Sequence, residues 1–532
     1  MKKKLGKIIT ALVLTAVLMF ALTACEDPIK GGQADGNVYG NGSLVVTQGD
    51  YIYFVNGMTT KDANNKSGEV VKGAIMRAKI DANGNIDDGG IVTIVPQAYF
   101  TSYTGGGLYI FGEWIYYVTP NPEKDKTGAS LSGQTLVMRT KIDGTKTKRI
   151  AVIKAEGVQY TVNKNYFIYL DGTDLKAIDL NKNNFKTSTI ETGVTSVKFP
   201  TAPYYSKSGY PPIFDYAVYT KNSSEKVTGQ THNEVKAVNG GGDKITLIGD
   251  KAYFNGDGYL ENLDDLYTYT LSTAVLDDAG NLTVYLSRSG FAVSGSKDNG
   301  VFAYTFTSGN GYAIDKDNVV WLSGSQKTTF KPAGTAAADG IFVVENGALF
   351  FYEGKNERIL LGVIGAGKTY ADKDAAAKSL NEQALKVYNG ELNLLRVTKY
   401  GSEGNLYEIY FTPSTSNGAL KRVIVSTDGT RAGTYAEDYK DFAPYDNVRV
   451  VIASDFVSNW IAPSFINYDG GRLYCYFIYA YNYNYLYRID LSAATADGRD
   501  YLADNSDLIK IVGKFNAADR ASYDEREKEE TE

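Results

Sequence analysis

Apolar and polar residues alternate in short runs that recur along most of the chain. A run rich in aromatic and β-branched residues is followed by a turn or loop, and then by a second run that carries basic or aromatic residues. Such runs predict β-strands, because these side chains fit a pleated, half-buried surface. The predicted strand pairs are 51–55 with 74–81, 114–118 with 136–144, 166–170 with 175–179, 216–219 with 235–238, 252–254 with 266–269, 348–352 with 359–361, 407–411 with 420–425, and 473–479 with 485–490. A further unit is expected within 301–322.

The spacing of these units predicts how they assemble. Their starts lie roughly 35 to 67 residues apart, a range that brackets the periods of repeat proteins built from four-stranded blades. One small antiparallel sheet is marginal alone, whereas radial stacking buries the faces of many. We therefore expect an all-β fold, a single β-propeller of eight four-stranded antiparallel blades, with seven as the alternative. Ring closure is expected to pair an early strand, 43–47, with the last one, 508–515. Two smaller propellers or an array of β-sandwiches are the other arrangements considered.

The N-terminal segment has the layout of an export signal. Four lysines precede an apolar run at 8–21, which is shorter than the roughly 20 residues that a membrane-spanning helix needs. The expected organisation is a signal peptide at 1–24, a flexible stalk at 25–43 rich in Gly, Asp and Asn, and the propeller at 44–515. A polar, Ala-rich helical insertion is expected near 370–388, and a charged disordered tail at 516–532.

The end of the apolar run resembles the lipobox of bacterial lipoproteins. Its residues are Leu22, Thr23, Ala24 and Cys25. In that family the cysteine thiol receives a diacylglyceryl group, and cleavage leaves the cysteine as residue one. The resemblance implies a lipid-anchored protein at the extracytoplasmic surface of a bacterial cell membrane, since two acyl chains suffice for stable anchoring. An ordinary signal peptide that ends near a cysteine is the alternative.

The repeated strands resemble a group of bacterial propellers related to the YWTD type of the low-density-lipoprotein receptor. The similarity lies in Tyr-Ile-Tyr-Phe at 51–54, Trp-Ile-Tyr-Tyr at 114–117, Tyr-Leu-Tyr-Arg-Ile-Asp at 485–490, and the Asp-Gly-Thr turns at 143, 171 and 428. It implies the fold and a binding habit, and no reaction. No unit contains the strict Tyr-Trp-Thr-Asp tetrad, so the receptor's specific partners are not implied.

The composition of the chain excludes several classes of partner and site. The chain has 61 acidic and 55 basic residues and a formal charge of −6, which argues against a nucleic-acid partner. Of its two cysteines, Cys25 is assigned to the lipid and Cys475 lies in an apolar run, so a buried inert thiol is expected. The single histidine, His232, is expected in a loop. A Ser-His-Asp triad would have to use His232, and no G-x-S-x-G motif lies near it; one imidazole and one free thiol exclude the usual zinc sites.

Two segments match a phosphate-binding and a calcium-binding pattern only in part. Residues 362–369 match the phosphate-binding pattern G-x-x-x-x-G-K-[ST], but that loop needs a βαβ unit, and the surrounding repeats are antiparallel. We expect a Gly-rich turn there and no nucleotide. Residues 81–88 are rich in oxygen ligands, yet Val92 stands where an EF-hand has Glu, so a hairpin tip is expected. Adventitious calcium is the alternative, and no cofactor or metal site is assigned.

The longest connecting segments suggest recognition rather than catalysis. Residues 56–73, 119–134 and 200–212 are rich in Gly, Lys or Tyr rather than in paired acids. The tyrosines between 474 and 487 are expected to pack between blades, with Asn482 and Asn484 in a hairpin; a single tyrosine-lined strand face is the alternative. We expect a non-catalytic module that binds a protein, a cell-wall polymer or a glycan. The alternatives are a carbohydrate-active enzyme with two carboxylates at the channel, and a structural part of an envelope complex.

The lipid anchor is directly testable by substitution of Cys25. Cys25→Ser removes the thiol that would be acylated, so metabolic labelling with a radioactive or clickable palmitate should be abolished. The variant should remain unprocessed or leave the membrane. Labelling that persists in Cys25→Ser, or that is absent from the wild type, would contradict the lipoprotein assignment.

Overall fold

The computed structural model of the chain describes residues 38–56, 74–95 apart from 82–83 and 88–89, and 107–200 apart from 164 and 183. From residue 216 onward it describes the strands given below, together with 240–243, 463 and 491. The predicted signal peptide, the helical insertion near 370–388 and the tail at 516–532 lie outside these residues. Within the described part of the chain, no helix has the length and apolarity that a membrane crossing requires.

The described residues form eight sheets. Each sheet is built from strands that follow one another in the chain, except that one later strand joins the sixth sheet. We number them in chain order. Sheets 1 to 4 contain β1 (Val38–Tyr39), β2 (Val45–Gln48), β3 (Tyr51–Val55), β4 (Ile75–Lys79) and β5 (Val92–Val95); β6 (Tyr109–Phe111), β7 (Trp114–Pro120), β8 (Thr135–Lys141) and β9 (Thr147–Ile153); β10 (Tyr160–Asn163), β11 (Tyr166–Asp171), β12 (Asp174–Asp179) and β13 (Thr187–Glu191); and β14 (Val194–Lys198), β15 (Tyr216–Ser224), β16 (Thr231–Asn239) and β17 (Lys244–Ile248).

The second half of the chain continues the pattern. Sheets 5 to 8 contain β18 (Tyr267–Leu276), β19 (Leu282–Gly290), β20 (Gly300–Phe306) and β21 (Val319–Ser323); β22 (Lys331–Ala337), β23 (Gly340–Glu345), β24 (Ala348–Tyr352), β25 (Ile359–Val363) and β29 (Gly433–Thr434); β26 (Leu392–Lys399), β27 (Leu406–Pro413), β28 (Leu420–Ser426) and β30 (Arg449–Ile452); and β31 (Ser464–Asn467), β32 (Leu473–Phe477), β33 (Leu486–Asp490) and β34 (Ile509–Ile511). Neighbouring strands are antiparallel except β25 and β29, which pair in parallel.

Most of the predicted strand pairs are confirmed by the register of the sheets. The pairs that begin at 51, 114, 166, 216, 348, 407 and 473 are β3 with β4, β7 with β8, β11 with β12, β15 with β16, β24 with β25, β27 with β28, and β32 with β33. Of the unit predicted at 252–269, residues 252–254 lie outside the described residues. β18 starts at Tyr267 and pairs with β19, and the unit expected at 301–322 supplies β20 and most of β21 to the same sheet.

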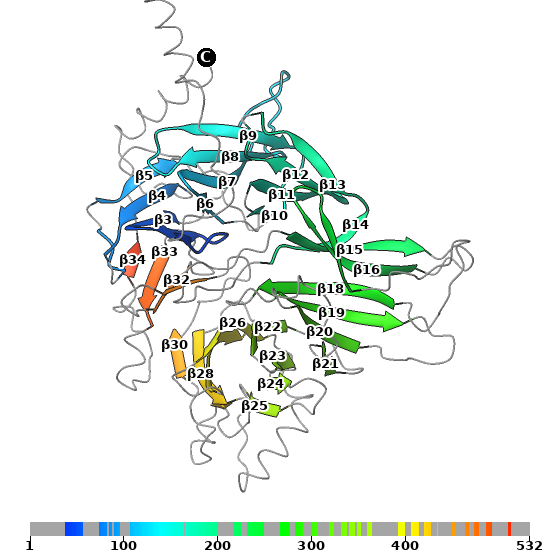
Figure 1. Cartoon of the computed structure of the whole chain (residues 1–532). Coiled ribbons are helices and arrows are strands. Elements are labelled where there is room, and N and C mark those ends of the chain that lie inside the picture. Colours follow the sequence, from blue (N-terminus) through cyan, green and yellow to red (C-terminus); the bar gives the residue numbers. More distant parts are fainter. Residues whose placement is uncertain are drawn as a thin grey trace, which may run out of the picture.

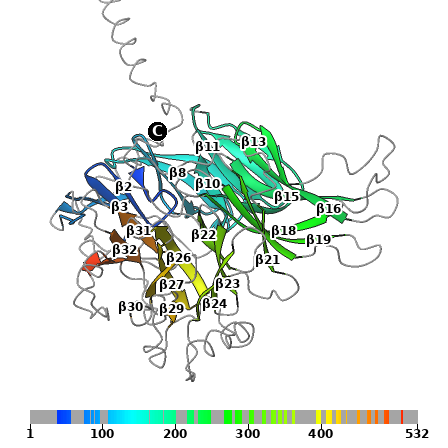
Figure 2. The ribbon, with the colours of Figure 1, turned by 60° about the horizontal axis from the view of Figure 1, so that its bottom comes forward.

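Packing between sheets explains why such small sheets are stable. Buried clusters join sheet 2 to sheet 3, sheet 3 to sheet 4, sheet 4 to sheet 5, and sheet 7 to sheet 8. Each cluster buries the apolar face of one sheet against the next, which is the source of stability in stacked repeats. The sheets follow one another around a common centre (Figures 1 and 2), so the molecule has a β-propeller-like all-β fold.

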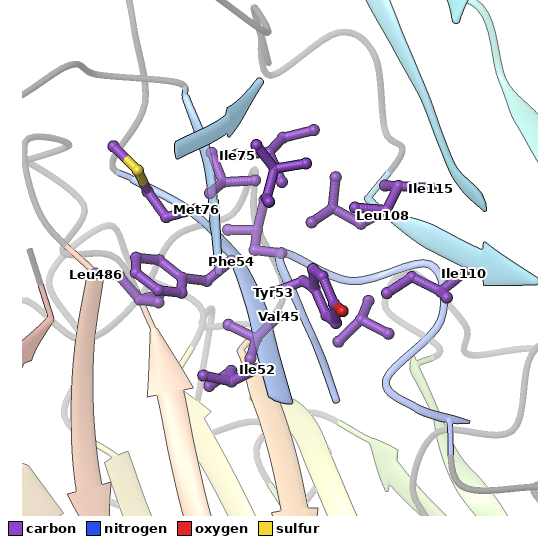
Figure 3. Packing of buried hydrophobic residues seen from close by; sticks show 14 of the residues in the cluster. Val45, Ile52, Tyr53, Phe54, Ile75, Met76, Leu108, Ile110, Ile115 and Leu486 are labelled. Atoms are coloured by element: carbon purple, nitrogen blue, oxygen red, sulfur yellow. The ribbon is translucent and has the colours of Figure 1, made fainter. Parts of the chain in front are cut away.

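The first and last sheets meet through side chains. The largest cluster combines residues of sheets 1 and 2 with Ile466, Tyr474, Tyr476 and Leu486 of sheet 8. Figure 3 shows Leu486 among the side chains that surround Phe54. The predicted closure by a shared pair of strands is wrong: β2 pairs with β1 and β3, and β34 pairs with β33 inside its own sheet. Apolar contact between complete sheets therefore does the closing.

The fold also starts earlier than the predicted stalk boundary at residue 43. Val38 is buried in β1, and the following turn binds the edge of sheet 2. Gly42 N donates to Leu108 O (2.7 Å), and Leu108 N donates to Ser43 O (2.8 Å). The amide of Asn41 completes the connection, since its Oδ1 accepts from Ile110 N (2.7 Å) and its Nδ2 donates to Ile110 O (3.1 Å). Residues 38–43 thus belong to the sheets rather than to the stalk.

In four of the eight described sheets, a tyrosine pairs in register with an arginine on the following strand, and that following strand is the last but one of the sheet. The pairs are Tyr53–Arg77 in sheet 1, Tyr116–Arg139 in sheet 2, Tyr410–Arg422 in sheet 7 and Tyr476–Arg488 in sheet 8. In each case the arginine stands two residues after a buried apolar residue: Ile75, Val137, Leu420 and Leu486. These four sheets are consecutive around the ring, because sheet 8 contacts sheet 1.

Three of these arginines connect their own sheet to the next one. Within its sheet, each guanidinium lies over the aromatic ring two residues before the paired tyrosine, at 4.9 Å for Arg77, 4.0 Å for Arg139 and 4.6 Å for Arg488. The same group reaches the following sheet. Arg77 donates to Ile142 O (3.0 Å), Arg139 lies 4.8 Å from the ring centre of Phe185, and Arg488 donates to Gly84 O. Cation–π and carbonyl contacts thus reinforce three successive junctions.

The contact between the first and last sheets should be essential for stability. Leu486→Ala removes a side chain that is 1% exposed and packs against sheet 1, so the free energy of unfolding should fall by about 2–5 kcal/mol. Val152→Ala, at a side chain that is 43% exposed on β9, is the control and should change it by less than about 0.5 kcal/mol. Denaturant unfolding of the mature chain measures both. Equal effects would show that the two sheets do not depend on this contact.

Candidate functional site

The segment 119–134, one of the three connections expected to take part in recognition, is described in full. It forms a hairpin between β7 and β8 whose residues 122–130 are all exposed (Figure 1). Its base is fixed by buried Asn121, whose Nδ2 donates to Gln134 Oε1 (3.0 Å) while its Oδ1 accepts from Glu123 N (3.0 Å). Of the other two connections, 57–73 and 201–212 lie outside the described residues.

The tip of this hairpin is held by one carboxylate. Asp125 Oδ1 accepts hydrogen bonds from Thr127 Oγ1 (2.6 Å), Thr127 N (2.8 Å) and Ala129 N (2.9 Å). These bonds, above all the one from the Thr127 hydroxyl, lower the pKa of Asp125. Lys124 and Ser130 flank the tip and face each other as an isolated antiparallel bridge. The hairpin therefore presents a shaped, mixed-charge surface rather than a loose loop.

A buried carboxylate lies where sheet 3 continues into sheet 4. Glu191, the last residue of β13, is 9% exposed and binds Lys244 Nζ at 2.7 Å and Lys221 Nζ at 3.1 Å. The Tyr219 hydroxyl donates to its Oε2 (2.7 Å), and Thr192 N donates to its Oε1 (2.9 Å). Burial by itself would raise the pKa of Glu191, but these four hydrogen bonds outweigh it and lower that pKa to about 2. Glu191 is thus a permanent anion at neutral pH.

A second buried carboxylate, Glu408, lies in sheet 7. It occupies the position two residues before Tyr410, where sheets 1, 2 and 8 have an aromatic residue, and it forms ion pairs instead of a stacking contact. Arg422 Nε lies 2.5 Å from its Oε1, and Arg396 Nη1 lies 3.8 Å from its Oε2. The Tyr410 hydroxyl also donates to Oε1 (3.3 Å). Both oxygens of Glu408 therefore face arginines.

Cations gather around two aromatic rings where sheet 2 meets sheet 3. The Arg139 guanidinium is 1% exposed and lies between the rings of Trp114 and Phe185. Lys141 Nζ lies 5.8 Å from the ring centre of Trp114, and Lys148 Nζ lies 5.3 Å from that of Phe185. Phe185 has φ of +44°, and among the described residues it is the one non-glycine in that region. We refer to these five residues as the cation cluster.

The residues singled out in the sequence are not gathered at one site. Cys25 and Lys368 lie outside the described residues. Cys475 is fully buried between sheets 7 and 8, and burial raises the pKa of its thiol well above the usual value. The loop predicted for His232 is wrong, because β16 extends further and pairs His232 with Ser223. Both oxygens of Asp81 accept hydrogen bonds from Asn85 at 2.8 Å, as expected for a turn residue.

The motif at 362–369 and the tyrosine-rich run are partly described. Gly362 and Val363 end β25, which is antiparallel to β24, while 364–369 lie outside the described residues. In the tyrosine-rich run, Phe477 pairs with Tyr487, so the chain reverses between them. A single strand that carries tyrosines 479 to 487 on one face is therefore wrong, while Asn482 and Asn484 lie outside the described residues. Buried Tyr474 and Tyr476 contact each other at 6.4 Å between ring centres.

Sequence reasoning missed Glu191, Glu408 and the cation cluster. The sequence did contain a signal for Arg139: an apolar residue, a methionine and an arginine follow one another at 75–77 and again at 137–139. Phe185 and Glu191 had no such signal, since their partners lie in strands that only the fold brings near.

Comparison with known proteins gives distant structural matches. No family model matches the chain, and no curated protein does. A polysaccharide lyase, Uly1, matches with a TM-score of 0.32 at 9% identity over 73% of this chain and 90% of that chain. A prolyl endopeptidase matches with 0.33 at 10% identity over 83% and 55%, and TolB from Acinetobacter baumannii with 0.21 at 11% identity over 71% and 78%. These are propeller-containing proteins of mixed function, and similarity at this level does not indicate an activity.

The ion-pair network of Glu191 should make stability depend on pH. The pKa of Glu191 is lowered from 4.5 to about 2 on folding, so its contribution is fully present above about pH 4.5 and lost as the pH falls through about 2. Glu191→Gln should reduce the free energy of unfolding at pH 7 by up to about 3 kcal/mol and should flatten its pH dependence in that window. Urea unfolding between pH 2 and 7 measures this.

The control for that experiment is Glu123→Gln. Glu123 forms an exposed pair with Arg149 (2.9 Å), which should contribute less than about 1 kcal/mol. If the wild type and Glu191→Gln lose stability in parallel as the pH falls, Glu191 is not the group that titrates.

Proposed function

We propose that this protein is a lipoprotein anchored through Cys25 to the extracytoplasmic face of a bacterial cell membrane. Its eight sheets are the blades of one β-propeller, with a helical insertion near 370–388 between blades 6 and 7. The propeller acts as a non-catalytic binding or scaffolding module. Its ligand is a protein, a cell-wall polymer or a glycan.

The observation that carries the binding interpretation is the state of the two buried carboxylates. Glu191 is held by two lysines and a tyrosine, and Glu408 by two arginines. Hydrolysis of a glycoside needs one carboxylic acid with a raised pKa beside a second, ionised one. The pKa of Glu191 is shifted the opposite way, to about 2, which suits a structural anion and not a proton donor.

The position of the first strand fits a tethered domain. Twelve residues separate Cys25 from Val38, so a fully extended stalk would span at most about 40 Å. That length keeps the propeller near the membrane while leaving its surface open to partners. The exposed hairpin at 121–134 is the described element best placed to contact one.

A pull-down from the cell envelope tests the function. Immobilised mature protein should capture a specific partner, and a screen for glycan hydrolysis should remain negative. Replacement of 125–129 by Asn-Gly keeps the Lys124–Ser130 bridge and closes it with a two-residue turn, so the fold should persist while capture is weakened.

Two results would change this proposal. Capture that is unaffected by the shortened hairpin would exclude the hairpin as the contact surface. Turnover of a glycan that is lost when one carboxylate is replaced would make the carbohydrate-active enzyme the preferred function.

A further inference from the structure

The position of β1 determines where the chain enters the sheets. Strands that begin successive sheets lie side by side, as do β2 and β6, β14 and β18, β18 and β22, and β22 and β26. Because the sheets follow one another around a common centre, these strands form its inner edge (Figures 1 and 2). β1 pairs with β2 on the side away from β3. It is therefore the innermost strand of sheet 1.

The connections between strands lie on two opposite faces of this arrangement. In an antiparallel sheet, β2–β3 and β4–β5 turn at one end, whereas β3–β4 and the link to the next sheet lie at the other end. We call the first end the turn face and the second the loop face. The described turn face contains residues 49–50, 112–113, 142–146 and 240–243. The described loop face contains the hairpin 121–134 and residues 154–159, 172–173 and 192–193.

Hydrogen bonds between sheets show that sheets 1 to 4 have the same orientation. One bond joins the first turns of sheets 1 and 2, and two others join loop-face positions of sheets 2 and 3 and of sheets 3 and 4. The bonds run from Gln48 Nε2 to Gly112 O (2.9 Å), from the Tyr160 hydroxyl to Gly107 O (2.9 Å), and from Val194 N to Thr173 O (2.9 Å). Like ends of these four sheets therefore lie on the same face.

Val38 lies at the turn face, near the centre. It is the register partner of Gln48, the last residue before the turn 49–50, and it is 2% exposed. From there β1 runs towards the loop face, where the turn at 40–43 binds the start of sheet 2 through Gly42 N and Leu108 O (2.7 Å). The chain then returns to the turn face as β2. A connection from Cys25 thus reaches the sheets at a fixed point on the turn face.

The length of that connection limits which face can approach the membrane. The twelve residues between Cys25 and Val38 span at most about 40 Å. A path around the outside of sheet 1 passes from β1 to β5, about 19 Å, and then along a strand the length of β3, about 17 Å. Almost the whole length is used before the loop face is reached. The tether can hold the turn face against the membrane and cannot lay the loop face there.

The composition of the loop face indicates what it fits. The exposed part of the hairpin 121–134 alternates in charge at Glu123, Lys124, Asp125 and Lys126, and the hairpin contains no aromatic residue. Anionic lipid and polyanionic polymers attract a surplus of positive charge, which this sequence does not supply. Polar residues of both signs are typical of the rim of a protein–protein contact.

We propose that the domain stands with its turn face towards the membrane and presents its loop face, with the hairpin 121–134, to a protein partner beyond the membrane surface. The inference rests on the anchor and the binding function proposed above. It adds the orientation of the domain, the surface that binds and the class of the partner.

Energy transfer to the bilayer measures the orientation. Lipidated protein is purified from membranes and reconstituted in phosphatidylcholine vesicles that contain a rhodamine-headgroup lipid as the acceptor. A donor fluorophore is attached through maleimide to Asp50→Cys on the turn face or to Lys126→Cys on the loop face. Both positions are exposed, whereas Cys475 is buried. The transfer efficiency should be at least twofold higher for Asp50→Cys, because that label lies closer to the lipid.

Matched variants verify that the face and the tether cause the difference. Glu113→Cys, also exposed on the turn face, should match Asp50→Cys, and Lys154→Cys, exposed on the loop face, should match Lys126→Cys. Insertion of about thirty Gly and Ser residues after Lys30 makes the tether longer than the path around the sheet, so the efficiencies of the two faces should converge. Thermal unfolding verifies that each variant keeps the fold.

The same two cysteine variants test the partner surface. A polyethylene glycol chain of about 5 kDa on Lys126→Cys should reduce capture from an envelope extract at least fivefold, whereas the same polymer on Asp50→Cys should reduce it less than twofold. Treatment of the extract with proteinase K should abolish capture. Capture that survives the protease, or that is unaffected by the polymer on Lys126→Cys, would exclude a protein partner at the hairpin.

Three results of the transfer experiment would overturn the orientation: equal efficiencies at the two faces, a higher efficiency at Lys126→Cys, or a difference that the longer tether leaves unchanged. The second result would mean that the chain passes back through the centre of the sheets. Failure of the proposed function looks different. Wild-type protein without acyl chains would not enter the vesicles, which would refute the anchor and the orientation together, and an extract that yields no partner would refute the binding function while the transfer still reports the orientation.

Discussion

A four-stranded antiparallel sheet has two faces and too few residues to cover either of them. Every sheet of this chain must therefore place its apolar faces against its neighbours, and the buried clusters follow that requirement from sheet 2 to sheet 5 and from sheet 7 through sheet 8 to sheet 2. Ring closure belongs to the same requirement. The last sheet needs a partner as much as any other, and sheet 1 supplies it.

The arginines act on this arrangement as local reinforcement. A guanidinium can lie flat on a ring in its own sheet and still direct N–H groups sideways, so one side chain serves two sheets. Sheet 7 shows what happens when the ring is replaced by a carboxylate. Glu408 forms ion pairs with Arg422 and Arg396 of its own sheet, so in sheet 7 an anion takes the place of the ring as the partner of the arginine. The position two residues before the paired tyrosine thus holds an aromatic ring in three sheets and a carboxylate in sheet 7, and both bind arginine.

The runs of aromatic and β-branched residues were enough to predict individual strands, because those at β3, β7, β11 and β32 are short and clearly bounded. It was not enough to find every strand: β19, which has a single aromatic residue, was not predicted, so the strands of sheet 5 were not recognised as one unit. Closure, Glu191 and Phe185 depend on residues more than one strand apart. Their partners could not be read from spacing, since antiparallel register and the order of the sheets decide which side chains meet.

Three described segments form backbone hydrogen bonds across a boundary between sheets. Residues 42–43 bind the edge of sheet 2, Val194 N of sheet 4 donates to Thr173 O of sheet 3 (2.9 Å), and β29 leaves the stretch between β28 and β30 to pair with β25 of sheet 6. Elsewhere each sheet is encoded by one uninterrupted stretch of sequence. Gene duplication can therefore copy a complete sheet in the middle of the chain, such as sheet 3 or sheet 4, and insert it as a working unit. A copy that ended at sheet 6 would separate β29 from its partner β25, whereas in the segment from sheet 3 to sheet 5 no described strand pairs outside its own sheet, so a copied sheet is inserted most easily there.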